Sequence, residues 1–269
     1  LSNYLNPKFI FNKALLAENF SSMEKYKKSK EIYKNFEKKY EIYHWYGVKK
    51  ISYIESKNNN NKKAIEYFKK NYNKLQNPTL KNFYDAANFY KNLENYEQAI
   101  KYYSKVLESL NQNHPLYSSI LYRRGGSYER IKNWKKSDED LLESLILSPK
   151  DAHALNYLAY SWLERNHNLE KSMDMLITAH NLKPNDPYIL DSIGWAYFLK
   201  GEYEIAQKFL QKAVILMPRD PIVNDHYADI LWKLNKKIQA TYFWKYVLSL
   251  EKTELKMKKI IEKKIIFGV

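Results

Sequence analysis

Residues 185–220 read NDPYILDSIGWAYFLKGEYEIAQKFLQKAVILMPRD, and this stretch decides the fold. Its apolar residues recur at the spacing of amphipathic helices, in two runs separated by a turn at Gly201. Pro218 follows the second run, at a place where proline stops a helix. The small residues Gly194 and Ala206 allow the two helices to approach closely. The stretch therefore predicts a helix–turn–helix hairpin over 187–220.

The same pattern recurs at intervals of 34 to 35 residues. The positions that hold this register are Pro149, Pro184 and Pro218, together with Tyr128, Trp162, Tyr197 and Leu231. We expect about seven hairpins, at 10–43, 45–78, 80–113, 118–151, 152–186, 187–220 and 221–254. One hairpin cannot bury its own apolar face, so neighbours must stack. The predicted fold is a single all-α domain over 1–269, a right-handed superhelical solenoid.

The last segment, 255–269, places Met257, Ile261 and Ile265 on one helical stripe, with Lys264 projecting close to it. A solenoid needs its terminal repeat covered, so we interpret this segment as a capping helix. Because the segment is basic and amphipathic, a helix lying on a membrane surface is the alternative.

The helical hairpins resemble the tetratricopeptide repeat (TPR), a helix–turn–helix unit of 34 residues. Over 155–250, the segments LNYLAYSW, LDSIGWAYFLKGEYEIA and DPIVNDHYADILWKL further resemble a family of exported TPR proteins of alphaproteobacteria. This resemblance implies a scaffold in bacterial envelope assembly, in a periplasmic or envelope-associated location. The residues themselves leave a cytoplasmic location open, and also whether a signal segment or further repeats precede Leu1. The resemblance assigns no catalytic residue.

Several kinds of chemistry are excluded or disfavoured by residue content. The chain has no Cys, which excludes disulfides, thiolate metal sites and a Cys nucleophile. No metal-binding helix motif, phosphate loop or nucleophile elbow occurs. The cluster Asp225, His226 and Asp229 is the nearest approach to acid–base machinery, but His226 points about 100° away from Asp225 on a helix. We therefore expect no enzyme activity, no metal and no cofactor.

The fold offers a concave groove lined by the first helix of each hairpin, and we predict that it binds another protein or a peptide segment. Its early part is basic and its late part acidic and aromatic, so the C-terminal half is expected to bind a basic extended or helical segment. Alternatively, Trp195 and Trp232 pack against neighbouring helices. The candidate groove residues are Tyr84, Asn88, Lys91, Tyr122, Glu129, Arg130, Asn156, Tyr160, Asp191, Trp195, Asp225, Asp229 and Trp232.

Charge supports a second interpretation. Residues 1–110 carry 21 Lys and Arg against 11 Asp and Glu. A basic helical-repeat protein that binds nucleic acid or an anionic membrane surface is therefore the alternative function. The helix-ending prolines and the Gly/Ala spacing favour a TPR array over an RNA-reading one, which makes nucleic acid the weaker alternative. The sequence does not specify the oligomeric state.

Overall fold

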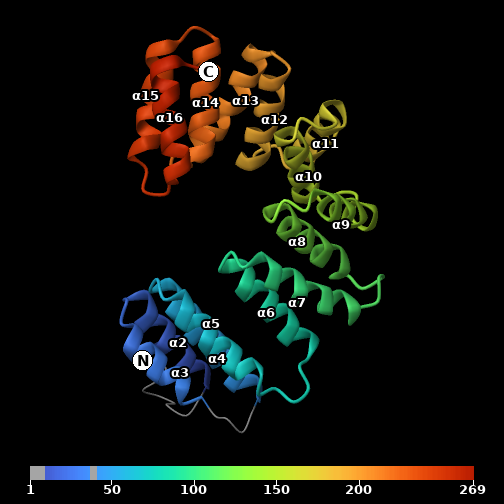
Figure 1. The fold of residues 1–269 in the computed structure, drawn as a ribbon, viewed down its shortest axis with the longest axis vertical. Helices are drawn as coiled ribbons and strands as arrows, with labels where there is room; N and C mark the ends of the chain where they lie inside the picture. Colours follow the sequence, from blue (N-terminus) through green and yellow to red (C-terminus); the bar gives the residue numbers. More distant parts are fainter. Residues whose placement is uncertain (1–9, 37–40) are drawn as a thin grey trace. The chain divides into compact units, whose positions relative to one another are not determined.

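The computed structural model describes residues 10–36 and 41–269. These residues form the helices α2–α16 and no strand, which confirms the all-α fold class (Figure 1). The chain forms two compact units, Leu1–Asn133 and Trp134–Val269, and the division falls inside the expected hairpin 118–151. Among the described helices, none combines the length and the apolar character needed to cross a membrane.

The first unit is a series of helix pairs with an aromatic core. Its helices are α2 (Ile10–Ser22), α3 (Tyr26–Lys34), α4 (Glu41–Lys57), α5 (Asn61–Tyr72), α6 (Leu80–Asn92), α7 (Tyr96–Glu108) and α8 (Tyr117–Arg130). Phe68 and Tyr103 are fully buried, and Trp45 contacts Phe68 edge-on at 5.4 Å. These large rings fill the space between successive hairpins, as the repeat pattern predicts for its aromatic positions.

The second unit continues the pattern and ends in a single helix. Its helices are α9 (Trp134–Leu147), α10 (Ala152–Glu164), α11 (Leu169–Leu182), α12 (Pro187–Leu199), α13 (Tyr203–Leu216), α14 (Pro221–Lys233), α15 (Lys237–Ser249) and α16 (Leu255–Phe267). Within this unit α10 contacts α12 and α12 contacts α14, while α16 packs on α15. The first helices of successive hairpins therefore form one continuous layer.

The repeat is visible in the backbone of the turns. At least one residue between the two helices of each pair adopts the left-handed conformation, with φ between 48° and 80°. These residues are Glu24, Asn59, Glu94, Lys132, Asn166, Asn168, Gly201 and Asn235, of which Asn166 and Asn168 share one turn. Only Gly adopts this conformation without strain, and Asn tolerates it better than most residues. Glu and Lys occupy it because the packing of the two flanking helices sets the path of the turn.

The starts of three first helices are capped in the same way. The carboxylates of Asp151, Asp186 and Asp220 each accept hydrogen bonds from two backbone amides of the first turn, at 2.9–3.2 Å. Pro187 and Pro221 occupy the first helical position, where proline needs no hydrogen-bond partner. These anionic caps fix where α10, α12 and α14 begin and thus which side chains share their exposed face.

Close packing within a hairpin is clearest at Gly194. A Cβ there would lie 2.6 Å from Cγ of the buried Leu210 on α13. The helices α12 and α13 therefore approach as closely as the small-residue pattern predicts.

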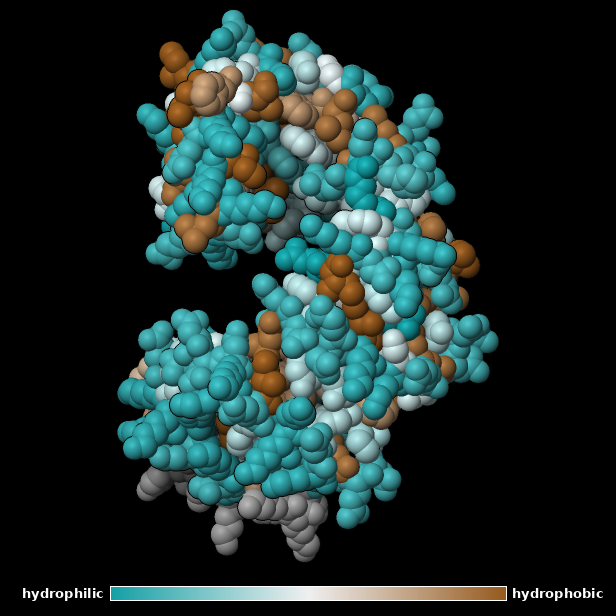
Figure 2. Space-filling model, in the orientation of Figure 1, coloured by the Kyte–Doolittle hydropathy of each residue, from teal (hydrophilic) through white to brown (hydrophobic). Residues whose placement is uncertain are grey.

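Most of the surface in Figure 2 is hydrophilic, but hydrophobic groups stand among hydrophilic ones over α15 and α16. Ile238, Leu255 and Phe267 are among the exposed apolar side chains of these helices.

Candidate functional site

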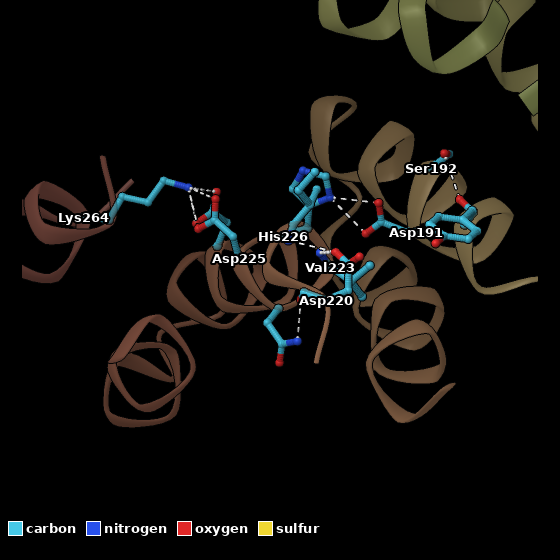
Figure 3. A network of polar contacts seen from close by, with 11 residues as sticks. Asp191, Ser192, Asp220, Val223, Asp225, His226 and Lys264 are labelled. Atoms are coloured by element: carbon cyan, nitrogen blue, oxygen red, sulfur yellow. Dashed lines mark hydrogen bonds and ion pairs between the residues drawn. The ribbon is translucent and has the colours of Figure 1, made fainter. Parts of the chain in front are cut away.

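The layer of α10, α12 and α14 carries all seven candidate residues of the second unit. Asn156 and Tyr160 lie on α10, Asp191 and Trp195 lie on α12, and Asp225, Asp229 and Trp232 lie on α14. The three aspartates are buried, whereas the other four side chains are partly exposed. A polar network links α12 and α14 to α16 (Figure 3).

The acidic pair on α14 holds a lysine from the last helix. Lys264 Nζ lies 2.7–2.9 Å from both carboxylate oxygens of Asp225 and of Asp229. Trp244 Nε1 on α15 donates to an oxygen of each aspartate at 3.1 Å. The side chain of Asp229 is 2% exposed and that of Lys264 is 16% exposed. One cation and one indole N–H thus pair with and orient two carboxylates in a largely water-excluded site.

His226 belongs to a different part of the network. Its Nδ1 lies 2.9 Å from Asp191 Oδ1, and Figure 3 shows the imidazole turned toward Asp191 while Asp225 faces Lys264. The imidazole stacks on the Trp195 ring, with 4.2 Å between centroids and 14° between planes. The Tyr160 ring lies 6.5 Å from the same imidazole. His226 therefore joins α10, α12 and α14 and holds the Trp195 ring in place.

The network shifts several pKa values. Burial would lower the pKa of His226, but the charge and hydrogen bond of Asp191 outweigh this and raise it. Burial, together with the neighbouring charge of Asp225, raises the pKa of Asp229 to about 6, although Lys264 opposes the shift. Burial also acts to lower the pKa of Lys264, and the two aspartates overcome it and raise that pKa. The site therefore favours a charged Lys264 and a charged His226.

Trp195 and Tyr160 are the aromatic groups that this network presents at the surface. Trp195 also stacks on Phe198, with 4.6 Å between centroids, and it remains partly exposed. Burial raises the pKa of Tyr160, and the charges of Glu164 and Asp191 add to the effect, so its hydroxyl stays protonated. Both rings can contact a partner without first being immobilised, because buried neighbours already fix them.

Trp232 and Asn156 have different surroundings. The Trp232 ring lies against the end of α16, since a Cβ at Gly268 would overlap it. It also packs on Trp244, with 5.4 Å between centroids. Asn156 Oδ1 is buried and has no hydrogen-bond partner. Trp232 thus contributes to seating α16, while Asn156 keeps an acceptor unused within the layer.

The candidate residues of the first unit lie on α6 and α8. Asn88 Oδ1 accepts a hydrogen bond from the hydroxyl of Tyr103 at 2.8 Å, and the Arg123 guanidinium lies 5.9 Å from the Tyr84 ring. Burial and the nearby Arg123 lower the pKa of Lys91. The remaining candidates are the partly exposed Tyr122 and Glu129, and the exposed Arg130, whose Nε donates to the Tyr96 hydroxyl.

The arrangement contains no constellation typical of catalysis. Asp225 and His226 face different partners, as the helical spacing predicts, so neither activates the other. Within residues 10–36 and 41–269, no group of three His, Asp or Glu side chains could hold a metal ion. What the site offers is a set of oriented rings and buried charges on adjacent helices.

The comparisons with known proteins agree with this architecture. A family model described as the tetratricopeptide repeat matches residues 80–111 and 188–216. The chain contains TPR repeats. The second match covers α12 and α13, the hairpin that carries Asp191 and Trp195. TPR folds typically serve as non-enzymatic scaffolds for protein interaction, and no catalytic family is indicated.

Similar proteins and structures extend the match. A TPR repeat-containing protein of Pseudomonas aeruginosa is 31% identical over 126 residues, which are 47% of this chain and 21% of that protein. The matched region thus spans about a fifth of this relative's length. A TPR protein from Parabacteroides merdae shares the fold with a TM-score of 0.72 and 16% identity, covering 96% of this chain and 98% of that one. PilW, a type IV pilus biogenesis factor, shares it at 0.60 and 18% identity, covering 71% and 86%.

Sequence reasoning missed the partners of the acidic TPR residues. It placed Lys264 only near the apolar stripe of the capping helix. The available signal was the interruption of that stripe by a lysine, which requires a buried acidic partner. The geometry around Trp195 was missed because His226 was weighed only as a possible acid–base group. Trp195 and His226 occupy non-equivalent positions in successive first helices, so the repeat register carried no signal for their stacking.

Proposed function

We propose that the chain is a non-enzymatic scaffold that binds another protein through the face of α10, α12 and α14. The observation that carries the proposal is the stack of Trp195 on His226, with the imidazole held by the buried Asp191. Trp195 stacks on both His226 and Phe198 and is still partly exposed, so it loses little conformational freedom on binding, which is a property of an interaction hot spot.

The neighbouring groups support a protein partner. Tyr160 provides a second fixed ring on the adjacent helix. Two oriented rings on adjacent helices suit a peptide segment, whose side chains occupy the aromatic surface. Nucleic acid would require available cations on this face, but the cations of the network are already paired, Lys264 with the two aspartates of α14 and His226 with Asp191.

The proposal extends to the bacterial envelope through the family resemblance over 155–250. The partner would then be an envelope component, and the chain would be recovered in the periplasmic or membrane-associated fraction of the producing cell. Fractionation of those cells with an antibody against the chain tests this part. Recovery in the cytoplasmic fraction alone would remove the envelope placement and leave protein binding untouched.

The experiment for protein binding compares three chains of residues 1–269 as bait at physiological salt, with nuclease present. The wild type and Tyr242→Ala, which truncates an exposed ring on α15, should retain the same protein. Trp195→Ala should bind it at least about tenfold more weakly, which is 1.4 kcal/mol or more. Equal retention by all three chains would refute the proposed face. Signal that disappears with nuclease or modest salt would instead support the nucleic-acid or charge-driven alternative.

A further inference from the structure

We propose that α16 is an exchangeable ligand held in cis, and that the partner docks a lysine-bearing amphipathic helix in the place that α16 occupies. This place, called the α16 seat, consists of Asp225, Asp229 and Trp232 from α14 with Trp244 and Val247 from α15. The inference rests on the proposed scaffold function and names the chemistry of the segment that this part of the surface selects.

The polar half of the seat is built for one ammonium group. Both carboxylates contact Lys264 Nζ at 2.7–2.9 Å, and each also accepts a hydrogen bond from Trp244 Nε1. The pKa of Asp229 is raised even with Lys264 in place, because burial and Asp225 disfavour its charge. The two aspartates therefore need a cation from whatever covers them. A lysine satisfies both carboxylates at once because its ammonium carries three donors.

The apolar half of the seat binds one face of a helix. Ile261 is fully buried in the cluster formed by Ala228, Leu231, Trp244 and Val247, and Met257 and Ile265 pack against the same cluster. Together with Lys264, these α16 residues lie on one helical face, at i, i+4, i+7 and i+8. Such spacing is the signature of an amphipathic helix lying in a groove between two others.

The contacts of α16 are those of a docked helix more than of an integral one. Ile261 is its single buried residue among the thirteen of the helix, whereas α14 buries nine residues. Leu255, Ile266 and Phe267 are 70–80% exposed. No side chain caps its N-terminus at Glu254. A helix with few buried groups opens locally at low cost, so its seat becomes available to a competitor.

The end of α16 adds a small number of further contacts. Gly268 lies against Trp232, and Lys233 Nζ donates to the Val269 carbonyl oxygen at 2.8 Å. These contacts involve the chain end and an exposed lysine. They help to align α16 on the seat. A partner helix reproduces the main anchors if it carries apolar residues at i, i+4 and i+8 and a lysine at i+7, as α16 does.

The test uses a fluorescein-labelled peptide with the sequence of residues 252–269 and chains of residues 1–269, read by fluorescence anisotropy. Lys264→Ala in the chain weakens the cis helix and should increase peptide affinity at least about tenfold over the wild type, the effect of losing one charge-assisted interaction. Lys263→Ala removes an exposed neighbour and should leave the affinity unchanged. In the peptide, replacing the lysine of position 264 by Ala should abolish the gain, and replacing that of 263 should not.

Several results would overturn the inference. If a folded Lys264→Ala chain binds the peptide no better than the wild type does, exchange at the seat is excluded. Exchange is also excluded if the peptide binds equally well with Lys or Ala at position 264. Hydrogen exchange on the wild type is independent of any variant: the amides of α16 should exchange at least about tenfold faster than those of α14. If the amides of α14 and α16 exchanged at the same rate, the two helices would open together, and a partner could not replace α16 alone. A wild-type dimer held by swapped α16 helices would assign the seat to a second copy instead.

Failure of the scaffold proposal and failure of the inference about the α16 seat give different results. If a protein is captured through Trp195 but an excess of the peptide does not displace it, the scaffold proposal stands and the inference about the seat fails. If the peptide exchanges as described while no protein is captured, the seat stands and the scaffold proposal fails. Displacement of the captured protein by the peptide supports both.

Discussion

Replacement of Lys264 by Met removes the ammonium group from Asp225 and Asp229 while keeping a side chain of similar length and apolar stem. Removing one partner of a buried ion pair costs about 3–5 kcal/mol when the remaining charge stays buried. Here the cost is limited in two ways. Asp229, with its pKa already raised to about 6, takes up a proton, and α16 can leave the seat so that water reaches both carboxylates. We therefore expect the docking of α16 to weaken by about 2–4 kcal/mol.

Hydrogen exchange of the α16 amides, followed by mass spectrometry, measures this local effect. A loss of 2–4 kcal/mol corresponds to an increase of about thirtyfold to a thousandfold in the opening equilibrium. The matched control is Lys263→Met, because Lys263 is exposed and adjacent in sequence. Its α16 amides should exchange as in the wild type. If the two variants exchange within about threefold of each other, the ion pairs of Lys264 do not hold α16 and the reasoning is wrong.

Three further predictions concern the described contacts. The pKa of Asp229 is raised from 3.8 to about 6 in the folded chain, so the native state binds this proton more tightly than the unfolded state does. The free energy of unfolding of the wild type should therefore fall by about 2–3 kcal/mol between pH 4 and pH 7, relative to that of Asp229→Asn. Urea unfolding at several pH values measures it, and the same pH dependence in both chains would contradict the prediction. Gly194→Ala places a Cβ 2.6 Å from Leu210 Cγ and should destabilise the second unit by about 1–3 kcal/mol in thermal unfolding; an unchanged melting temperature would show that α12 and α13 can separate freely. Tyr103→Phe removes the 2.8 Å hydrogen bond to Asn88 and should cost about 1 kcal/mol in urea unfolding, whereas a stabilised variant would count against that bond.

The hairpins were predictable because their signals are local. Pro218 stops a helix wherever it stands, and Gly194 permits close approach to whatever faces it, so a regular spacing of such residues predicts the array. The turn conformations were less predictable. Glu94 and Lys132 adopt positive φ although neither residue favours it, because the two flanking helices determine the turn.

The site was only partly predictable because its pairings cross many residues of sequence. Helical geometry alone predicts that Asp225 and Asp229 share a face and that His226 points elsewhere. The partners Lys264 and Asp191 lie on other helices, and only the packing of α16 on α15 and of α12 on α14 brings them within hydrogen-bond distance. The acidic residues expected to meet a partner directly are thus already paired within the chain.

The most direct test of protein binding by the α10–α12–α14 face is site-specific photo-cross-linking in the producing cell. A photoreactive phenylalanine analogue replaces Tyr160 on the face or, as a control, the exposed Tyr242 on α15. We expect a discrete protein adduct from position 160 that is lost in the Trp195→Ala background, and none from position 242. Equal adducts from both positions, or adducts that nuclease digests, would contradict it.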